Sequence, residues 1–252
     1  MLSVVIPAHN EADKIGRAIT SIRDYALNKG WDVEVVVVDD GSTDGTGQAA
    51  HDVAAAPLTV RVLRNEPNQG KGFSVRRGMM EATGRLRIFC DADMSTPIDQ
   101  LDALLPWVDR SFDVVIGSRR LPESVLQPPQ RFSRRTLGRI FRRIRSLILL
   151  GDIRDTQCGF KLFTAAAAEE VFPMQQVRGP AFDCEILALA RARGYRIKEV
   201  GVLWRNDPDS RMRPLRDGWG MLLSLLRIRR RIARMQAATA KPVPAGPLER
   251  SV

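Results

Sequence analysis

The chain has 252 residues, a net charge of +10, 44% hydrophobic and 27% charged residues, a composition typical of a folded protein with room for one large α/β domain. Its three cysteines are odd in number and lack metal-ligand spacing, so they argue for a reducing compartment and against a disulfide framework. Only two histidines occur, which disfavours a His-based zinc site and a Ser-His-Asp triad.

The two halves of the chain differ in charge. Residues 1–109 carry 11 basic and 16 acidic side chains, whereas residues 110–235 carry 26 basic and 12 acidic ones. The acidic half could hold a metal ion, and the basic half could attract phosphate or an anionic surface. The N-terminus leads straight into an apolar strand, so we expect no signal peptide. No apolar run approaches the ~20 residues that span a bilayer.

Predicted strands and helices alternate in the first half. The strands are expected at residues 2–6, 33–38, 60–63, 88–90 and 114–117, and the helices around residues 15–22, 73–82 and 100–108. This alternation predicts an α/β fold with a mostly parallel, Rossmann-like central sheet flanked by helices. Because polar loops follow the strands, we expect them to meet at the sheet edge where open α/β sheets bind ligands.

The pattern changes after residue 117. The Pro- and Gln-rich segment 121–132 predicts a loop, and the Ala- and Pro-rich residues 236–252 predict a disordered tail. Residues 137–148 and 219–235 predict basic amphipathic helices. The apolar stripe of the second helix consists of Met221, Leu225, Ile228, Ile232 and Met235.

These two helices have three interpretations. They could pack on the core with a solvated basic face, or lie in the plane of an anionic membrane. The sequence leaves both open. Nucleic-acid binding fits less well, because aromatic content is 6% and no recognition module is visible.

Two carboxylates, Asp91 and Asp93, directly follow the apolar run 88–90. In an extended chain, side chains two residues apart point the same way. At the end of a strand such a pair suits a divalent cation that holds a diphosphate. Asp-x-Asp also occurs by chance, and a solvated turn is the alternative, so this interpretation depends on the other motifs.

Several motifs occur in a fixed order along the chain. They are Leu2–Glu11, Asp39–Thr46, Asn68–Gly72, Asp91–Asp93 and Gly117–Arg119. Together they resemble the family 2 glycosyltransferases of GT-A fold. Arg154–Phe163 and Ala181–Glu185 narrow the resemblance to the dolichyl-phosphate β-glucosyltransferases, with polyprenyl-phosphate mannose synthases next nearest.

The resemblance implies a nucleotide-sugar donor and a set of residues that bind it. This set comprises Pro7, Asn10, Glu11, Asp39, Asp40, Lys71 and Asp91. Carboxylates such as Asp39 and Asp40 could accept from a uracil N–H or ribose hydroxyls, and helix capping is the alternative for Asp40. Glycines around Lys71 would let the backbone approach a ligand, although Lys71 could also be an exposed lysine at a helix start.

The implied cofactor is Mg²⁺ or Mn²⁺ at Asp91 and Asp93. In the family the second aspartate usually ligates the ion directly, and the first assists or contacts ribose. Mannose synthases carry glutamine two residues after the pair, where this chain has Ser95. This departure favours the glucosyltransferase branch and leaves the third partner of the metal open.

On the acceptor side, a phosphate monoester has a second pKa of about 6, so it is already ionised and needs cations rather than a strong base. The resemblance places these cations at Arg119, Arg131 and Arg135. The expected catalytic set is Asp93, Arg119, Asp155 and Asp183. For Asp155 and Asp183 we assign no proton transfer. Asp183 could instead cap the helix at 186–192. The alternative for Asp155 is a purely structural role, as an ion-pair partner of Arg154 or Lys161.

We therefore expect a GT-A catalytic domain at residues 1–214 and a membrane-associated helix at residues 215–235. The expected reaction is the metal-dependent, inverting transfer of a hexose to a polyprenyl phosphate. The expected hexose is glucose, and the expected donor is UDP-glucose. Alternatives are GDP-mannose as donor, a saccharide hydroxyl as acceptor, or a non-catalytic basic binding module. We expect the protein to bind the membrane surface and not to bind nucleic acid. Its expected location is the cytoplasmic face of the membrane, as a peripheral protein.

Overall fold

The computed structural model describes residues 1–127, 149–205 and 214–239. These residues form a seven-stranded sheet in the order β3-β2-β1-β4-β7-β5-β8. The strands are β1 (Leu2–Ala8), β2 (Val33–Asp39), β3 (Leu58–Arg64), β4 (Leu86–Phe89), β5 (Val114–Ser118), β7 (Lys161–Thr164) and β8 (Ile197–Gly201). Every pairing is parallel except the two made by β7. The predicted mostly parallel α/β sheet is thus confirmed.

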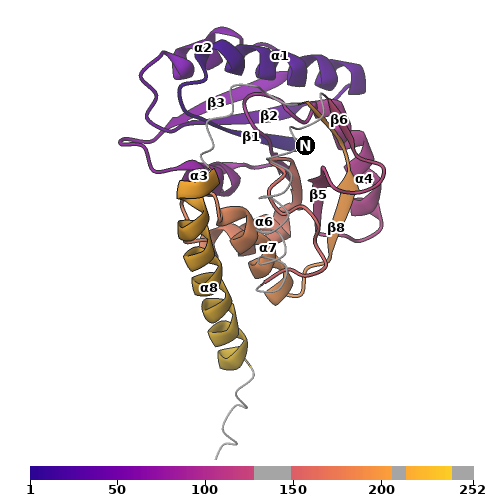
Figure 1. Cartoon of the computed structure of the whole chain (residues 1–252). Helices are drawn as coiled ribbons and strands as arrows, with labels where there is room; N and C mark the ends of the chain where they lie inside the picture. Colours follow the sequence, from indigo (N-terminus) through magenta and orange to yellow (C-terminus); the bar gives the residue numbers. More distant parts are fainter. Residues whose placement is uncertain (128–148, 206–213, 240–252) are drawn as a thin grey trace, which may run out of the picture.

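Helices cover both faces of this sheet (Figure 1). They are α1 (Ala12–Lys29), α2 (Thr46–Asp52), α3 (Lys71–Glu81), the 3₁₀ turn η1 (Ile98–Gln100), α4 (Leu101–Asp109), α6 (Ala165–Met174), α7 (Phe182–Ala192) and α8 (Pro214–Thr239). Helices α1, α2 and α4 pack in one apolar core, and α3, α6, α7 and α8 pack in a second one. Successive strand residues alternate between the two cores, since Val4 and Ile6 join the first and Val5 the second.

Two predicted local features differ in the structure. Pro7, expected to end the first strand, lies inside β1 in register with Val38. Because β4 pairs with β1 only as far as Val5, β1 has a single neighbour at Pro7, as on an edge strand where proline is tolerated. Lys161 also opens a strand that is not among those expected from the sequence, since β7 lies between β4 and β5.

The apolar stripe predicted for the last helix is confirmed, and it packs on the protein core. Met221, Leu225 and Ile228 are buried, while Ile232 and Met235 pack against the second core at its margin. Helix α8 continues to Thr239, so the first residues of the expected disordered tail are helical. The other predicted helix, residues 137–148, lies outside the described residues. Within the described ranges, no helix is both long and apolar enough to cross a bilayer.

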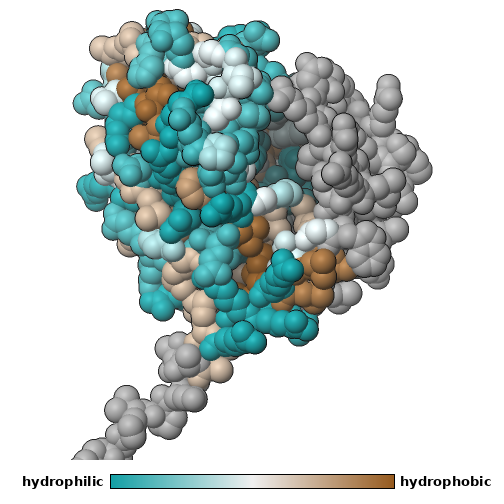
Figure 2. Space-filling view, turned by 90° about the vertical axis from the view of Figure 1, so that its left-hand side faces the viewer, coloured by the Kyte–Doolittle hydropathy of each residue, from teal (hydrophilic) through white to brown (hydrophobic). Residues whose placement is uncertain are grey.

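A small second sheet lies beside the main one. It pairs β6 (Val125–Gln127) with β9 (Leu203–Arg205) in parallel. In Figure 1, β1 runs leftward from the N-terminus, toward the side of the molecule on which α8 lies. Figure 2 looks directly at this side, where hydrophobic patches lie among hydrophilic surface.

Candidate active site

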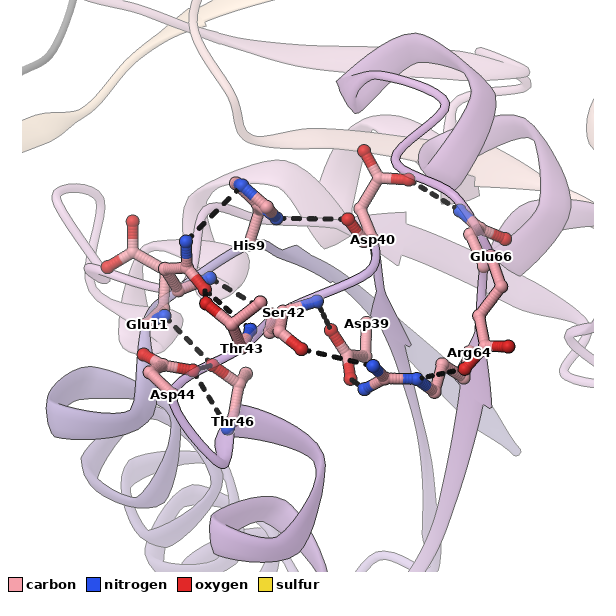
Figure 3. Close-up of polar contacts among 12 residues, drawn as sticks. His9, Glu11, Asp39, Asp40, Ser42, Thr43, Asp44, Thr46, Arg64 and Glu66 are labelled. Atoms are coloured by element: carbon pink, nitrogen blue, oxygen red, sulfur yellow. Dashed lines mark hydrogen bonds and ion pairs between the residues drawn. The ribbon is translucent and has the colours of Figure 1, made fainter.

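The loops that follow β1 and β2 are bonded to each other, as the sequence predicts for strand ends at one sheet edge (Figure 3). The Asn10 amide donates to Ser42 Oγ at 3.0 Å, and the Thr43 amide donates to Asn10 Oδ1 at 2.9 Å. The Glu11 amide donates to Thr46 Oγ1 at 2.9 Å. Asn10 has a φ of 54°, a left-handed conformation that asparagine adopts more readily than most residues. Asn10 and Glu11 thus lie beside the loop after β2.

The buried Asp39 side chain holds the loop after β2 by hydrogen bonds. Its carboxylate is 1% exposed, accepts from the Ser42 amide at 2.8 Å and from Arg64 Nη1 at 2.7 Å. Arg64 also donates to Glu66, so Asp39 belongs to a short network at the end of β3 (Figure 3). A ligand would have to share these oxygens with the protein.

Asp40 fixes the Gly-rich loop rather than a helix end. Its Oδ1 accepts from Asn65 Nδ2 and the Gln69 amide, at 2.8 and 2.9 Å, and its Oδ2 accepts from the Gly70 amide at 2.8 Å. The capping alternative for Asp40 is wrong, because the Thr46 amide at the start of α2 donates to Asp44 instead. Asp40 thus fixes the position of the loop that leads into Lys71.

The glycines of that loop approach protein backbone. The Gly72 amide donates to the Arg178 carbonyl at 2.7 Å. A Cβ at Gly72 would stand 2.6 Å from the Val177 carbonyl oxygen, and one at Gly70, where φ is 94°, would stand 2.8 Å from the Arg178 carbonyl oxygen. Only glycine fits this close approach, which presents Lys71 at the start of α3.

Lys71 pairs with Asp91, the first of the two candidate metal ligands. Burial would lower the pKa of Lys71, but the Asp91 and Asp183 carboxylates outweigh it and raise that pKa above its ordinary value. A Cβ at residue 159 would overlap Asp91, so Gly159 leaves the room in which this carboxylate lies. Lys71, Asp91 and Asp183 therefore form one charged cluster at the sheet edge.

Asp93 is exposed and lies in a turn. The Met94 amide donates to the Asp91 carbonyl at 3.0 Å, and the Ser95 amide donates to Asp93 Oδ1 at 2.8 Å. The chain is therefore not extended here, and the argument that placed the two side chains on one side of a strand is wrong. What brings Asp91 and Asp93 to the ligand edge is the turn that follows β4. Ser95, in the position left open by the sequence, is buried.

Two carboxylates suit an ion whose other ligands come from substrate and water. The described residues contain no group of three or more His, Cys, Asp or Glu side chains arranged to hold a metal. Mg²⁺ commonly binds proteins through one or two carboxylates together with substrate phosphates. The Asp91–Asp93 turn fits that pattern and does not fit an all-protein metal cage.

Arg119 follows β5 and is held by Asp155. The Arg119 amide, Nε and Nη2 all donate to the Asp155 carboxylate, at 3.0, 2.7 and 2.9 Å. Burial would raise the pKa of Asp155, but Arg119 outweighs it and holds that pKa well below its usual range. The Arg119 guanidinium also lies 5.5 Å from the centre of the Trp204 ring. Its Nη1 has no partner among the described residues and is available to an anion.

The backbone around Asp155 is fixed from β8. Glu199 accepts from the Arg154 amide at 2.9 Å and from the Asp155 amide at 2.7 Å. Asp155 therefore holds Arg119, and neither Arg154 nor Lys161 is its main partner. Arg131 and Arg135, the other expected phosphate ligands, lie outside the described residues.

Asp183 is buried at the start of α7 and pairs with a buried lysine. Lys161 Nζ donates to Asp183 Oδ1 and to the Cys158 carbonyl, both at 2.5 Å, and the Lys161 side chain is 0% exposed. Burial raises the pKa of Asp183 above its ordinary value, although both nearby lysines act in the opposite direction. Asp183 thus joins the charged cluster, and Lys161 is a site residue that the sequence did not indicate.

Glu185, two residues further along α7, connects the core to α8. Its Oε2 accepts from the Gln176 and Val177 amides, at 2.9 and 2.7 Å, and its Oε1 accepts from Arg231 Nη1 at 2.6 Å. Arg231 Nη2 also donates to the Met174 carbonyl at 2.5 Å. Sequence reasoning missed this pair because its members lie 46 positions apart and meet only when α8 packs on α7.

The ordered strand-end loops and the GT-A-like sheet agree with a comparison to known families. Residues 3–172 match the family described as Glycosyl transferase family 2. The chain belongs to this family. The predicted family, the fold class and the enzyme class, a glycosyltransferase, are thereby confirmed.

Proteins with similar sequences include several dolichyl-phosphate β-glucosyltransferases. A dolichyl-phosphate β-glucosyltransferase of Trichomonas vaginalis is 34% identical over 220 residues, which cover 83% of this chain and 65% of that protein. The dolichyl-phosphate β-glucosyltransferase of Saccharomyces cerevisiae is 33% identical over 248 residues, which cover 90% of this chain and 74% of that protein. This family 2 chain thus spans less than two thirds of the first relative and about three quarters of the second.

A solved structure shares the fold at lower identity. The glucosyl-3-phosphoglycerate synthase of Mycobacterium tuberculosis, in complex with Mn²⁺, UDP-glucose and phosphoglyceric acid, superposes with a TM-score of 0.69 at 21% identity. The match covers 91% of this chain and 79% of that one. It supports the GT-A-like arrangement of sheet and helices.

Proposed function

We propose that this glycosyltransferase moves glucose from UDP-glucose to a dolichyl-type polyprenyl phosphate and forms a β-linked lipid-phospho-glucose. The observation that carries the proposal is the similarity, over more than four fifths of the chain, to relatives named for glucose transfer to dolichyl phosphate. The strand-end loops and the Arg119–Asp155 pair supply the two sides that such a reaction needs.

The donor side is the region around β1, β2 and the turn after β4. Pro7, Asn10 and Glu11 would border the nucleotide. Asp39 and Asp40 would act mainly by fixing the loops, since their oxygens already accept several internal hydrogen bonds. Lys71, held at Asp91, would place a positive charge beside the diphosphate.

Asp91 and Asp93 would hold a divalent cation, Mg²⁺ or Mn²⁺, with the remaining ligands from diphosphate and water. Mn²⁺ and UDP-glucose are present together in the M. tuberculosis structure named above. The ion would offset negative charge on the departing nucleoside diphosphate. Exposed Asp93 would be the direct ligand, and the Asp93–Ser95 bond would orient it.

The acceptor phosphate needs positioning more than deprotonation. With a second pKa of about 6, it is largely a dianion at neutral pH. Its oxygen forms the new bond to C1 of glucose as the bond from C1 to the diphosphate breaks, and UDP leaves with that electron pair. Attack opposite the leaving group inverts the configuration. Nη1 of Arg119, oriented by Asp155, would bind the phosphate, with Arg131 and Arg135 as further expected ligands.

The test is a donor and acceptor screen with purified protein. Liposomes that contain polyprenyl phosphate are incubated with Mg²⁺ or Mn²⁺ and UDP-glucose, GDP-mannose, UDP-GlcNAc or UDP-GalNAc. We expect labelled lipid from UDP-glucose above all. Preference for GDP-mannose would establish the mannosyl alternative, and transfer to soluble sugars would establish the hydroxyl-acceptor alternative. No turnover of any donor would overturn the proposal.

A matched pair of variants tests the metal turn. Asp93→Asn is expected to lower kcat/KM by about 100-fold or more, a loss typical of damaged metal sites. Asp99→Asn removes another exposed carboxylate a few residues away and is expected to leave kcat/KM within about twofold, as surface changes usually do. Equal activities of the two variants would remove Asp93 from the site.

We also propose a peripheral position at the cytoplasmic membrane face. On α8, Leu223 and Leu226 are exposed on the same helix as Arg227, Arg229 and Arg230, and such a surface suits an anionic bilayer. Flotation with vesicles of increasing anionic lipid content tests this position. Binding that does not depend on anionic lipid would contradict it.

A further inference from the structure

A groove separates α8 from the segment that leads into α7. Its volume is about 680 Å³, within the usual range of ligand pockets. The residues of that segment in its lining are 176–181. The Gly72 amide bonds to the Arg178 carbonyl, so this segment also supports the Lys71 loop. The groove therefore adjoins the catalytic side without including Asp91, Asp93 or Arg119.

The floor of the groove is apolar. Ala181, Met221 and Ile228 line it and are 2%, 9% and 2% exposed. A ligand with a hydrocarbon part would cover this surface and gain from its burial.

The rim of the groove is positively charged. Arg178, Arg227 and Arg231 line it, against a single carboxylate from Glu185. That carboxylate is 2% exposed and fully engaged, since it accepts from two backbone amides and from Arg231. Glu185 and Arg231 thus neutralise each other, and the charges of Arg178 and Arg227 remain.

Arg178 and Arg227 differ in the hydrogen bonds and ring contacts that they make within the protein. Arg178 Nη1 donates to Gln69 Oε1 at 2.7 Å, and its guanidinium lies 5.4 Å from the centre of the Phe73 ring. Arg227 is exposed and has no hydrogen-bond or ion-pair partner among residues 1–127, 149–205 and 214–239. Its planar fork of donors suits a phosphate.

We infer that this groove binds an anionic phospholipid of the membrane surface. Its phosphate would lie at Arg227 and Arg178, and its hydrocarbon would lie on Ala181, Met221 and Ile228. The two arginines without a carboxylate partner favour an anion, and the apolar floor favours a ligand with hydrocarbon over a free phosphate or a nucleic-acid backbone. The binding needs neither a nucleotide sugar nor a metal, so it is independent of the proposed reaction.

The first test compares two arginines of the same helix. The full chain is titrated by calorimetry with dihexanoyl-phosphatidylglycerol below its micelle concentration, without nucleotide or metal. We expect Arg227→Gln to weaken binding by roughly tenfold, the loss typical of a charge-assisted hydrogen bond. Arg229→Gln removes the same charge from α8, but Arg229 does not line the groove. Monomeric lipid presents no bilayer surface, so this variant is expected to bind the short-chain lipid like the wild type.

Two other ligands identify the source of the anion. Inorganic phosphate and dihexanoyl-phosphatidylcholine are expected to bind much more weakly, since each lacks either the hydrocarbon or the net charge. Equal affinity for inorganic phosphate, or equal effects of Arg227→Gln and Arg229→Gln, would overturn the inference. So would equal affinity for the phosphatidylcholine.

A second pair of variants tests the groove volume without changing charge: one variant fills the groove, and the other is its control. Ser224 lines it, and its hydroxyl donates to the Gly220 carbonyl at 2.8 Å. Ser224→Phe would occupy the lipid volume and is expected to abolish phosphatidylglycerol binding, whereas Ser224→Ala is expected to retain it. Unchanged melting temperatures verify that both variants fold. Retained binding by Ser224→Phe would place the lipid elsewhere, whatever the donor screen shows.

Discussion

In the loop after β2, the buried carboxylate of Asp40 accepts from neutral donors, two backbone amides and an asparagine, while its neighbour Asp39 accepts from one amide and from Arg64 at the end of β3. Around β5, β7 and α7, buried carboxylates pair with cations, as Asp155 does with Arg119 and Asp183 with Lys161. The consequence of removing a partner differs between these regions. A neutral donor without its acceptor costs about 1–3 kcal/mol, whereas an unpaired buried charge costs about 3–5 kcal/mol.

The ion pairs of the second region, around β5, β7 and α7, also join elements that are far apart in the sequence. The pairs Lys161–Asp183 and Arg231–Glu185 join β7 to α7 and α7 to α8. The first region orders loops on a sheet edge that its own strands already define. We therefore expect substitutions in the second region to affect global stability, and those in the first to affect local loop order.

The largest effect is expected at Lys161. Lys161→Met would leave Asp183 buried without its cation and lower the free energy of unfolding by about 4 kcal/mol in urea titrations. Adding Asp183→Asn is expected to restore part of that loss, because the uncompensated carboxylate is gone. A double variant less stable than Lys161→Met would show that Asp183 has another strong partner and that its charge stays compensated without Lys161.

A slightly smaller and pH-dependent loss is expected at Asp155. Asp155→Asn should cost about 3 kcal/mol at pH 7, because Arg119, whose side chain is only 20% exposed, loses its carboxylate partner. The pKa of Asp155 is lowered in the folded state, so its contribution is complete above the ordinary aspartate pKa and is lost as pH falls toward the folded value.

The free energy of unfolding of wild type and Asp155→Asn can be compared at pH 7, 5 and 3. We expect an unchanged difference between pH 7 and 5 and a smaller one at pH 3. A difference that increases on acidification would contradict the assigned sign of the pKa shift.

A moderate loss is expected at Asp40. Asp40→Asn keeps one acceptor oxygen of two, and should cost about 1–2 kcal/mol. Hydrogen exchange is expected to accelerate at the Gln69 and Gly70 amides and to stay unchanged in α7. The control Asp52→Asn, at an exposed carboxylate of α2, is expected to change stability by less than about 0.5 kcal/mol. Faster exchange throughout α7 would remove the distinction between the two regions.

The smallest expected effect concerns the three buried thiols, Cys90, Cys158 and Cys184. Burial raises the pKa of Cys158 to about 11, so only about one in a thousand Cys158 thiols is ionised at pH 8. Native protein should therefore react very slowly with a thiol reagent.

Thiol reactivity also reports which region opens. Lys161→Met is expected to speed the reaction of Cys158 and Cys184, whereas Asp40→Asn leaves it unchanged. Peptide mapping of the labelled protein assigns each cysteine. Rapid labelling of Cys158 in the wild type would show that the second region opens without any substitution.

Much of the fold follows from short-range patterns. The continuous apolar run of β2 predicts a buried parallel strand, and polar residues directly after strands must meet at one sheet edge. For that reason Asn10, Asp40, Asp91 and Arg119 could all be assigned to this edge from the sequence. The apolar stripe of α8 is likewise visible at helical spacing, because the same face repeats every three or four residues.

Tertiary structure decided which of these polar groups are already engaged. Nothing near Asp155, Glu185 or Lys161 in the sequence indicates Arg119, Arg231 or Asp183 as partner, because each pair forms only when separate strands and helices pack. The antiparallel insertion of β7 was hidden for the same reason, since a lysine is buried in a strand only where a carboxylate from another element meets it. Periodicity and loop position are local properties of the chain, whereas charge pairing depends on which elements become neighbours.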